Sequence, residues 1–302
     1  MRRSRGDCIG QDKIRQDRRD TPEMESRLTV SIPSIPFTKM TAGGNDFVVI
    51  DNRRGIVPAP VGDFVRASCR RRMSVGADGV LLIEEDPELD FRMRYYNADG
   101  GEVEMCGNGA RCIARFAYLE GIAGAKMRFR SGAGTHEAEI RGEGVRLKMT
   151  DPTHYRPHVE IPTSTGRVYA SSINTGVPHV VIAVDDLESV PVVDLGREIR
   201  YHEMFQPDGT NVNFIRQDGD AVANRTYERG VEDETFACGT GAVAAAIMGH
   251  RLFGLAPPID VTTRGGDRLC VDFGIEGDTY RDVYLEGGAR VVYEGELITG
   301  GD

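Results

Sequence analysis

Two cysteines of this 302-residue chain stand in closely similar surroundings. Cys106 is followed by Gly-Asn-Gly and Cys238 by Gly-Thr-Gly, and an apolar segment typical of a helix comes after each motif. A thiol at a helix N-terminus lies beside unpaired N–H groups and the positive end of the helix dipole, which lower the thiol pKa. The glycines let those N–H groups bind an anion such as a carboxylate. The pattern therefore predicts two reactive thiols, each beside an anion cradle.

The two motifs belong to an internal repeat. Residues 90–121 align with residues 222–254, and each copy has a strand pattern, a polar acidic loop, Cys-Gly-x-Gly and an apolar helix. A period that long indicates two duplicated domains rather than a solenoid. Because twofold duplication places equivalent elements face to face, we expect Cys106 and Cys238 to share one site.

Two thiols on opposite sides of one carbon can invert a stereocentre. One thiolate removes the proton, and the opposite thiol returns a proton to the other face. Helix N-termini would stabilise the carbanion as an enediolate. One cysteine before a glycine-rich helix is more often structural, but two in matching halves favour catalysis. The other cysteines are expected to be inert or to lie in a core: Cys8, Cys69, Cys112 and Cys270.

The elements that would position these motifs are mostly strands. Strand patterns recur along the chain, the clearest at 47–51, 79–85, 90–97 and the hairpin of 137–141 with 145–149. Only two segments indicate helices, 109–121 and 241–254, and each ends at a glycine. Both are apolar on nearly every side, which predicts a helix enclosed by other structure. The expected fold class is therefore α/β (α+β), with a curved sheet around each helix.

Composition excludes several classes of partner. Hydrophobic residues make up 40% of the chain, enough for a large core, and the net charge of −10 argues against nucleic acid or an anionic membrane. No apolar run approaches the roughly 20 residues that span a bilayer, and the arginine-rich start lacks the apolar core of a signal peptide. We therefore expect a cytoplasmic protein. The absence of Cys-x-x-Cys argues against a zinc site.

A second motif is compatible with a different function. Residues 239–244, Gly-Thr-Gly-Ala-Val-Ala, satisfy the Gly-x-Gly-x-x-Ala fingerprint, and Asp260 follows where a ribose-binding acid would fall. A dinucleotide-binding protein is therefore an alternative. It is disfavoured because strands follow strands here, without the alternating helices of that fold, and because it does not account for Cys-Gly-Asn-Gly in the first half.

Six ordered blocks carry a resemblance to a known family. They are residues 39–51, 76–84, 96–112, 174–181, 210–214 and 227–242. From Phe37 onward the chain resembles diaminopimelate epimerase, a cofactor-independent isomerase of lysine and peptidoglycan precursor synthesis. The resemblance implies interconversion of L,L- and meso-diaminopimelate, with no cofactor, no metal and a homodimeric assembly. It also implies two pseudo-symmetric domains, each a barrel-like sheet wrapped around a central buried helix.

The resemblance also gives roles to individual residues. Cys106 and Cys238 match the two acid/base cysteines, and His179 matches a histidine near the site. The matching substrate contacts are the amides Asn45, Asn97 and Asn211, the pair Glu228 and Arg229, and the backbone cradle of Gly107, Asn108, Gly239 and Thr240. A substrate with two ammonium and two carboxylate groups needs such acceptors, donors and a forked guanidinium.

Three departures from the family pattern concern the substrate rather than the reaction. Ala42 replaces a glycine of the first loop, Val177 replaces a substrate-binding asparagine, and the loop at 230–235 is one residue longer. A proline or hydroxyproline racemase of the same fold is therefore an alternative. The Arg229 and asparagine set favours the longer, doubly zwitterionic substrate.

The predicted organisation has four parts. Residues 1–35 are polar and mixed in charge, so we expect a disordered N-terminal extension. Residues 36–150 and 151–286 are the two expected domains, with the active site between them. The resemblance implies that the final strand, within 287–302, returns to the first domain.

Overall fold

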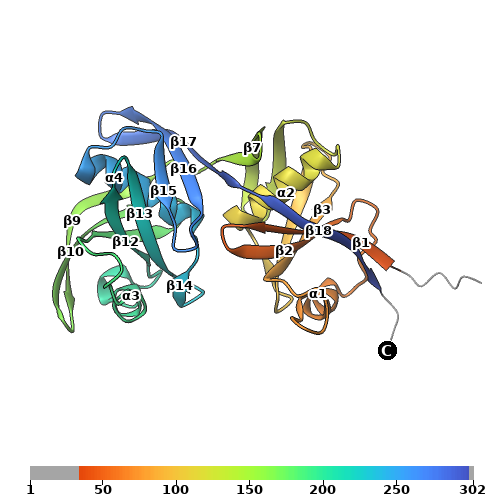
Figure 1. Ribbon diagram of the computed structural model, residues 1–302, viewed down its shortest axis with the longest axis horizontal. Helices are drawn as coiled ribbons and strands as arrows, with labels where there is room; N and C mark the ends of the chain where they lie inside the picture. The colour runs from red at the N-terminus through yellow and green to blue at the C-terminus, as the bar shows by residue number, and fades with distance from the viewer. Residues whose placement is uncertain (1–33, 299–302) are drawn as a thin grey trace, which may run out of the picture.

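The computed structural model describes residues 34–298, so the expected disordered extension 1–35 lies outside the described part except for its last two positions. The described strands are hydrogen-bonded into one continuous sheet. Figure 1 shows that this sheet forms two lobes side by side. Within residues 34–298, no helix has both the length and the apolar character needed to cross a membrane.

The two lobes repeat one strand order. In the first lobe the order is β18-β1-β2-β3-β4-β6-β7-β8, with β2/β3 and β4/β6 parallel and the other pairs antiparallel. In the second lobe it is β9-β10-β11-β12-β13-β15-β16-β17, with β11/β12 and β13/β15 parallel. The predicted duplication is therefore present down to the direction of each strand pair.

The strand bounds follow the chain. Those of the first lobe are β1 (Ser34–Ala42), β2 (Asn45–Asp51), β3 (Gly79–Glu84), β4 (Phe91–Asn97), β5 (Glu102–Val103), β6 (Lys126–Ser131), β7 (Gly134–Arg141), β8 (Gly144–Lys148) and β18 (Arg290–Ile298). Those of the second are β9 (Thr153–Thr163), β10 (Gly166–Asn174), β11 (Pro178–Ala183), β12 (Asn211–Asp218), β13 (Ala221–Glu228), β14 (Asp233–Thr235), β15 (Ile259–Thr262), β16 (Arg268–Glu276) and β17 (Thr279–Gly288).

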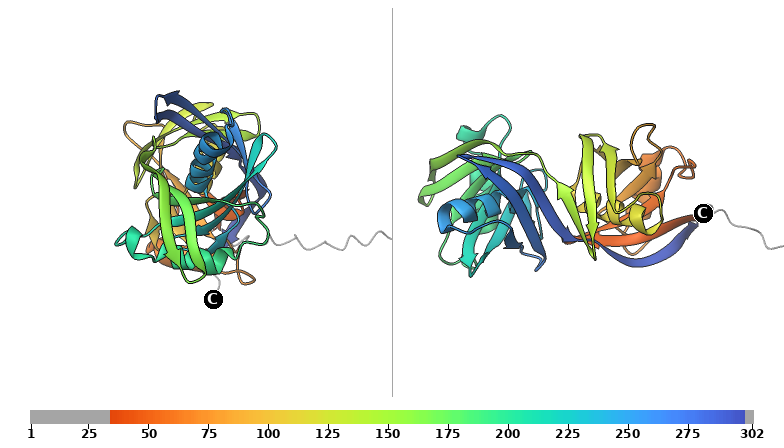
Figure 2. Two further views of the ribbon diagram at one scale, coloured as in Figure 1. Left: turned by 90° about the vertical axis from the view of Figure 1, so that its left-hand side faces the viewer. Right: turned by 90° about the horizontal axis from the view of Figure 1, so that it is seen from above.

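Strand pairs also join the lobes. β17 pairs with β16 of its own lobe and with β8 of the first lobe, both antiparallel. The chain then crosses, and β18 pairs with β1. Seen from above in Figure 2, these last strands run from one lobe to the other. The last strand therefore lies in the first lobe, and the crossing at residues 287–289 forms part of the junction.

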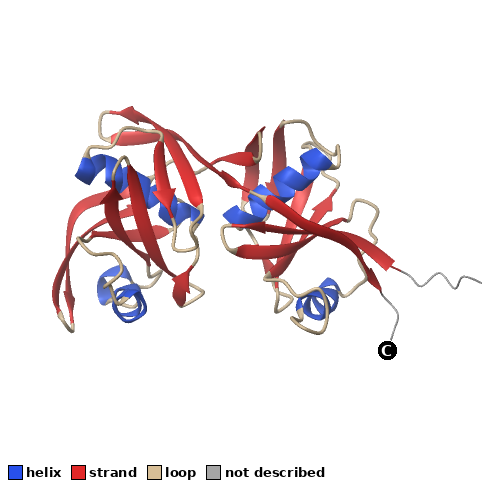
Figure 3. Ribbon diagram, in the orientation of Figure 1, coloured by secondary structure: helices blue, strands red, loops and turns tan. Residues whose placement is uncertain are grey.

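Each lobe encloses one helix, as the apolar patterns predict. The first is α2 (Gly107–Leu119) and the second is α4 (Gly239–Phe253). Figure 3 shows both surrounded by strands. α4 is buried without interruption from residue 241 to 249, and it ends at Gly254, which adopts the left-handed conformation with φ of 71°. Cys112 on α2 is fully buried in the core, as predicted.

The prediction of only two helices is wrong. α1 (Val61–Cys69) and α3 (Val192–Arg200) cover the outer faces of the two sheets over separate apolar cores, and η1 (Glu203–Phe205) is a short 3-10 turn. α3 contains Gly196, which lowers helix propensity and conceals the pattern. A Cβ at Gly196 would lie 2.5 Å from Cβ of Tyr227, so the glycine is what lets α3 approach β13.

Candidate active site

The duplicated lobes place both cysteines of the repeat in the same structural position. Cys106 is the N-cap of α2 and Cys238 is the N-cap of α4. The Cys106 sulfur accepts the N–H of Gly109 at 3.4 Å, and the Cys238 sulfur lies 3.4 Å from the hydroxyl of Thr240. Both thiols therefore border the unpaired N–H groups at the start of a central helix, as predicted.

These helix starts lie where the lobes meet. Some Cα atoms of α2 and α4 are within 8 Å of each other. A Cβ at Gly44, in the loop between β1 and β2, would lie 2.5 Å from Cβ of Phe236, just before Cys238. The negative form of Cys106 also raises the pKa of Cys238, so the two thiols influence each other electrostatically. The structure thus brings the two cysteines into one region between the lobes.

Burial decides the charge state of both thiols. It raises the pKa of Cys106, although N–H groups of Gly109 and Asn108 oppose the rise. Burial, together with the charge of Glu228, raises the pKa of Cys238 to about 12. The predicted lowering is therefore wrong in direction, because loss of hydration outweighs the helix N-terminus. Both thiols are neutral at pH 7.

Glu228 lies at the end of β13 beside Cys238. Its carboxylate accepts the hydroxyl of Thr235 at 2.9 Å, and it lies near enough to the Cys238 thiol for each group to shift the pKa of the other. Burial raises the pKa of Glu228, and the interactions with Thr235 and Cys238 only partly oppose the rise. A poorly hydrated carboxylate near a thiol is a competent proton acceptor for that thiol.

The first-lobe wall of the site is a chain of amides. Asn108 donates to the side-chain oxygen of Asn45 at 2.8 Å and to the carbonyl of Gly43 at 3.4 Å. Asn45 in turn donates to Asp78 at 2.9 Å. Gly107 faces open space, since a Cβ there would meet no atom within 4 Å. Because Gly107 is also the first residue of α2, its N–H group has no partner within the helix, as the cradle requires.

The second-lobe wall combines Asn211, Arg229 and His179. The Asn211 side chain donates to the carbonyl of Pro178 at 3.2 Å and accepts the N–H of Arg229 at 2.8 Å. Asn211 also pairs with His179 in the register of β12 and β11. Burial lowers the pKa of His179 to about 3, with a smaller effect of the Arg229 charge, so His179 is neutral. Its Nδ1 lies 2.9 Å from the amide of Asn213.

Asn97 is the predicted residue least connected to the others. It is exposed, and its side-chain oxygen accepts the Tyr95 hydroxyl at 2.6 Å. Within residues 34–298, no hydrogen bond joins its side chain to another predicted site residue. Tyr95 itself is buried, and the charge of Cys106 contributes to raising its pKa.

Sequence reasoning missed several buried polar residues around the site. Thr175 donates to the carbonyl of Thr240 at 2.9 Å and holds the loop that contains Val177 against the start of α4. Asn213 supports His179, as described above. Thr175 follows an apolar strand pattern, and Asn213 interrupts one. An isolated polar residue that faces the interior of a sheet is the sequence signal by which both could have been identified.

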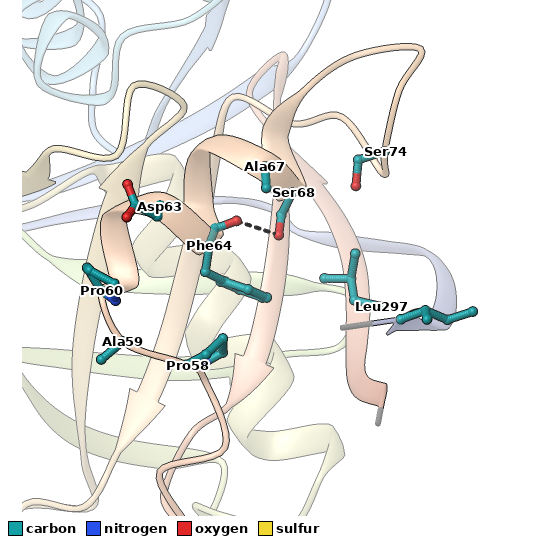
Figure 4. A pocket seen from close by; sticks show the side chains of 10 residues that line it. Pro58, Ala59, Pro60, Asp63, Phe64, Ala67, Ser68, Ser74 and Leu297 are labelled. Carbon is teal, nitrogen blue, oxygen red and sulfur yellow. Dashed lines mark hydrogen bonds between the residues drawn. The ribbon is translucent and has the colours of Figure 1, made fainter. Parts of the chain in front are cut away.

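The cavities differ in their relation to these residues. One of about 380 Å³ lies between α1 and the end of β18, lined by Phe64, Ala67 and Leu297 among others (Figure 4). It contains none of the predicted site residues. Another, of about 690 Å³, lies at the junction of the lobes and is lined by Gly43, Gly44 and Asp267. It too contains none of the predicted site residues, but the carbonyl of Gly43 accepts a hydrogen bond from Asn108.

The duplicated lobes, each with a thiol before its central helix, define an isomerase of the epimerase type. A family model described as Diaminopimelate epimerase matches residues 37–155 and 171–292, and the chain belongs to the diaminopimelate epimerase family. A diaminopimelate epimerase of Aquifex aeolicus is 46% identical over 279 residues, which cover 86% of this chain and 97% of that protein.

Two solved structures extend the likeness of fold. A phenazine biosynthesis protein of the PhzF family from Bacillus anthracis matches with a TM-score of 0.68 at 15% identity, over 88% of this chain and 99% of that one. A hydroxyproline epimerase from Agrobacterium vitis with bound trans-4-hydroxy-L-proline matches with 0.64 at 17% identity, over 88% and 92%. At such identities the likeness concerns the fold alone.

The dinucleotide-binding alternative is not supported. β13 and β15, the strands on either side of α4, pair in parallel, but their other neighbours β12 and β16 run antiparallel to them, unlike the parallel sheet of a dinucleotide-binding fold. Asp260, the residue expected at the ribose, lies on β15 and pairs with Arg268 at 3.0 Å. The glycines at 239 and 241 therefore serve the thiol site and the packing of α4.

Proposed function

We propose that this chain interconverts L,L- and meso-diaminopimelate by proton transfer between two thiols, without a cofactor or a metal ion. The observation that carries the proposal is the presence of a cysteine at the N-cap of each central helix where the two lobes meet. Cys106 and Cys238 are its acid/base pair. Relatives that carry the name of this activity support the choice of substrate.

The proton path starts from neutral thiols. In one direction Glu228 accepts the proton of Cys238, which becomes the thiolate while Cys106 keeps its proton. Once Cys106 has given that proton to the substrate, the N–H groups of Asn108 and Gly109 stabilise the thiolate that remains. The thiolate on one face removes the α-proton, and the C–H electron pair moves into the adjacent carboxylate to form an enediolate. The neutral thiol on the opposite face delivers its proton to that carbon, which inverts the centre. In the reverse direction the two thiols exchange roles.

Substrate recognition divides between the two walls. The reacting carboxylate is held by the helix starts, where N–H groups meet the charge as it develops on the enediolate. The residues of this cradle are Gly107, Asn108, Gly239 and Thr240. The ammonium groups and the distal carboxylate are bound by Asn45, Asn97, His179, Asn211, Glu228 and Arg229. His179 is neutral, so it recognises substrate by hydrogen bonding rather than by charge.

A proline-type racemase is the alternative within the same fold. The fold likeness to the hydroxyproline epimerase supports it, and the replacement at Val177 leaves one polar contact fewer for a long substrate. Incubation of the reduced enzyme with L,L-diaminopimelate, L-proline and trans-4-hydroxy-L-proline, followed by chiral chromatography, separates the two. The proposal predicts inversion of diaminopimelate only, and inversion of a proline alone would refute the choice of substrate.

We further propose that the protein is a homodimer in the cytoplasm. Its domain boundaries are placed where the chain passes from one lobe to the other, near residues 150 and 287. Two reduced thiols are needed for the reaction, which suits a reducing compartment. Exposed apolar side chains on β18, Val292, Tyr293 and Ile298, offer a surface for a second copy. Sedimentation of the reduced protein across a concentration series tests the dimer, and a single monomeric species throughout would exclude it.

A further inference from the structure

One buried charge in the first lobe has no role in the proton path. Arg111 on α2 is 0% exposed, and the structure gives it no carboxylate within 4 Å in the range 34–298. Its Nη2 donates to the side-chain oxygen of Asn108 at 2.7 Å, and its Nε donates to the carbonyl of Gly288 at 3.5 Å. Both acceptors are neutral. Its counter-charge must therefore come from something other than an ordinary ion pair.

A buried cation without a counter-ion destabilises a fold, and replacement by an apolar residue of similar size is often tolerated or stabilising. Arg111 is nevertheless held firmly. A Cβ at Gly287 would lie 3.2 Å from Nε of Arg111, so the strand that crosses between the lobes packs directly on the guanidinium. The groups whose negative form would favour the charge of Arg111 are the thiols of Cys106 and Cys112 and, from the second lobe, the carboxylate of Asp267. Of these, Cys106 is in the site.

Arg111 also fixes the direction of the amide chain. A guanidinium only donates hydrogen bonds, so the Asn108 oxygen must face Arg111 and its nitrogen must face the other way. That nitrogen donates to Asn45, whose own nitrogen then points at Asp78. Each amide in the first-lobe wall therefore takes its orientation from the buried cation at one end and the carboxylate at the other.

We propose that Arg111 is a positioning residue of the active site, which orients Asn108 and Asn45 and places a fixed positive charge behind the start of α2 to favour an anion there. The anion is the Cys106 thiolate during proton transfer and, if the proposed function is correct, also the reacting carboxylate. The charge acts through the helix start, and Arg111 itself does not touch the substrate.

The reactivity of the Cys106 thiol tests this without any substrate. Besides Arg111, the charge of Glu228 shifts the pKa of Cys106, and the charge of Cys106 in turn raises the pKa of Tyr95, Cys112 and Cys238. Reduced enzyme and the Arg111→Met variant are alkylated with iodoacetamide at pH 8, and the rate at each cysteine is followed by mass spectrometry of its peptide. Cys238 in the same sample is the internal reference, because Arg111 does not appear among the groups that shift its pKa.

Loss of the cation is expected to raise the pKa of Cys106 by about one unit. Because greater nucleophilicity partly offsets the lower thiolate fraction, the Cys106 rate should fall about three- to fourfold, while the Cys238 rate is unchanged. Arg115→Met is the matched control: Arg115 lies on the same helix, and its guanidinium bonds the surface carbonyl of Gly142. Arg115→Met also removes one positive charge from the chain, and it should alter the alkylation rate of neither Cys106 nor Cys238.

Two further variants at position 111 keep the test decisive. Arg111→Lys retains the charge and should keep the Cys106 rate near that of the wild type. Arg111→Gln is neutral but retains a donor, and it substitutes for Arg111→Met if that variant does not show the wild-type circular dichroism spectrum. An unchanged or faster Cys106 rate in a folded neutral variant would overturn the proposal, and so would an equal decrease at both cysteines. Neither outcome depends on whether diaminopimelate is the substrate.

Discussion

Gly241 lies where α4, the second thiol and a buried polar network meet. Its replacement by alanine tests how closely packed and how rigid this region is. A Cβ at Gly241 would lie 2.6 Å from the side-chain oxygen of Asn213 and 3.3 Å from Cβ of Cys238. Asn213 is fully buried and has little freedom to move. Its oxygen accepts the Thr226 hydroxyl at 2.9 Å, and its nitrogen lies 2.9 Å from Nδ1 of His179.

The expected magnitude follows from these contacts. Overpacking a fixed core costs about 1–3 kcal/mol, and a broken buried hydrogen bond costs about 1–3 kcal/mol more. Alanine returns up to about 1 kcal/mol of helix propensity. The net destabilisation of Gly241→Ala is therefore about 1–3 kcal/mol when the network relaxes in part. The added methyl group would also displace Cys238. Displacement of a catalytic group should lower turnover by about tenfold or more.

The duplicated lobe supplies the matched control. Gly109 holds the equivalent position in α2, but a Cβ there would lie 3.1 Å from a methyl group of Leu81 and 3.5 Å from Cβ of Cys106. A leucine methyl can move by a few tenths of an ångström, so the gain in helix propensity offsets the contact. Gly109→Ala should remain within about 1 kcal/mol of the wild type.

Urea unfolding of the reduced proteins measures both variants, with far-UV circular dichroism as the probe because the chain has no tryptophan. We expect a lower urea midpoint and slower turnover for Gly241→Ala than for Gly109→Ala. If Gly241→Ala were as stable and as active as its counterpart, the proposed rigidity of the network beneath the second thiol would be wrong.

Three other predictions concern the site. Cys106→Ala and Cys238→Ala should each abolish interconversion, measured by chiral chromatography, because each face needs its own acid/base group; near-normal turnover in either would exclude the two-thiol mechanism. Mild oxidation should join Cys106 to Cys238 and stop turnover until reductant is added, and a peptide map showing other pairs would contradict the shared site. Burial raises the pKa of Glu228 above its unfolded value, so its charge costs stability as pH rises through the unfolded pKa, fully so above the folded pKa. Glu228→Gln should therefore unfold at a higher temperature than the wild type at pH 7, lose this advantage below about pH 4, and be inactive; an equal advantage at both pH values would contradict the sign.

Much of the architecture could be predicted from sequence because its signals are local. The apolar segments after each cysteine, with glycine at their ends, were sufficient to identify α2 and α4. α3 could not be found in this way, because Gly196 lowers its propensity and is required only by its contact with Tyr227 on a distant strand. A helix or strand pattern describes a single element, whereas Gly196 is required by the contact between two elements, α3 and β13.

At the site, too, local sequence signals could not reveal what depends on contacts between distant parts of the chain. The positions of Cys106 and Cys238 followed from the repeat, but the direction of their pKa shifts did not. A helix N-terminus is visible in the sequence, while the burial that outweighs it depends on the whole lobe closing around the thiol. Arg111 was also missed, because each arginine of α2 has the appearance of a surface residue until the crossing strand is seen to cover Arg111.

In the proposed mechanism one thiol acts on each face of a single carbon. Proton NMR of L,L-diaminopimelate with the reduced enzyme in D₂O distinguishes this from the action of a single base. We expect that, early in the reaction, the meso product carries deuterium at its inverted carbon while the remaining L,L substrate keeps its proton, because the incoming deuteron comes from a different thiol. Equal early deuteration of substrate and product would indicate a single exchanging base, and formation of product without deuterium would contradict transfer from a solvent-exchanged thiol.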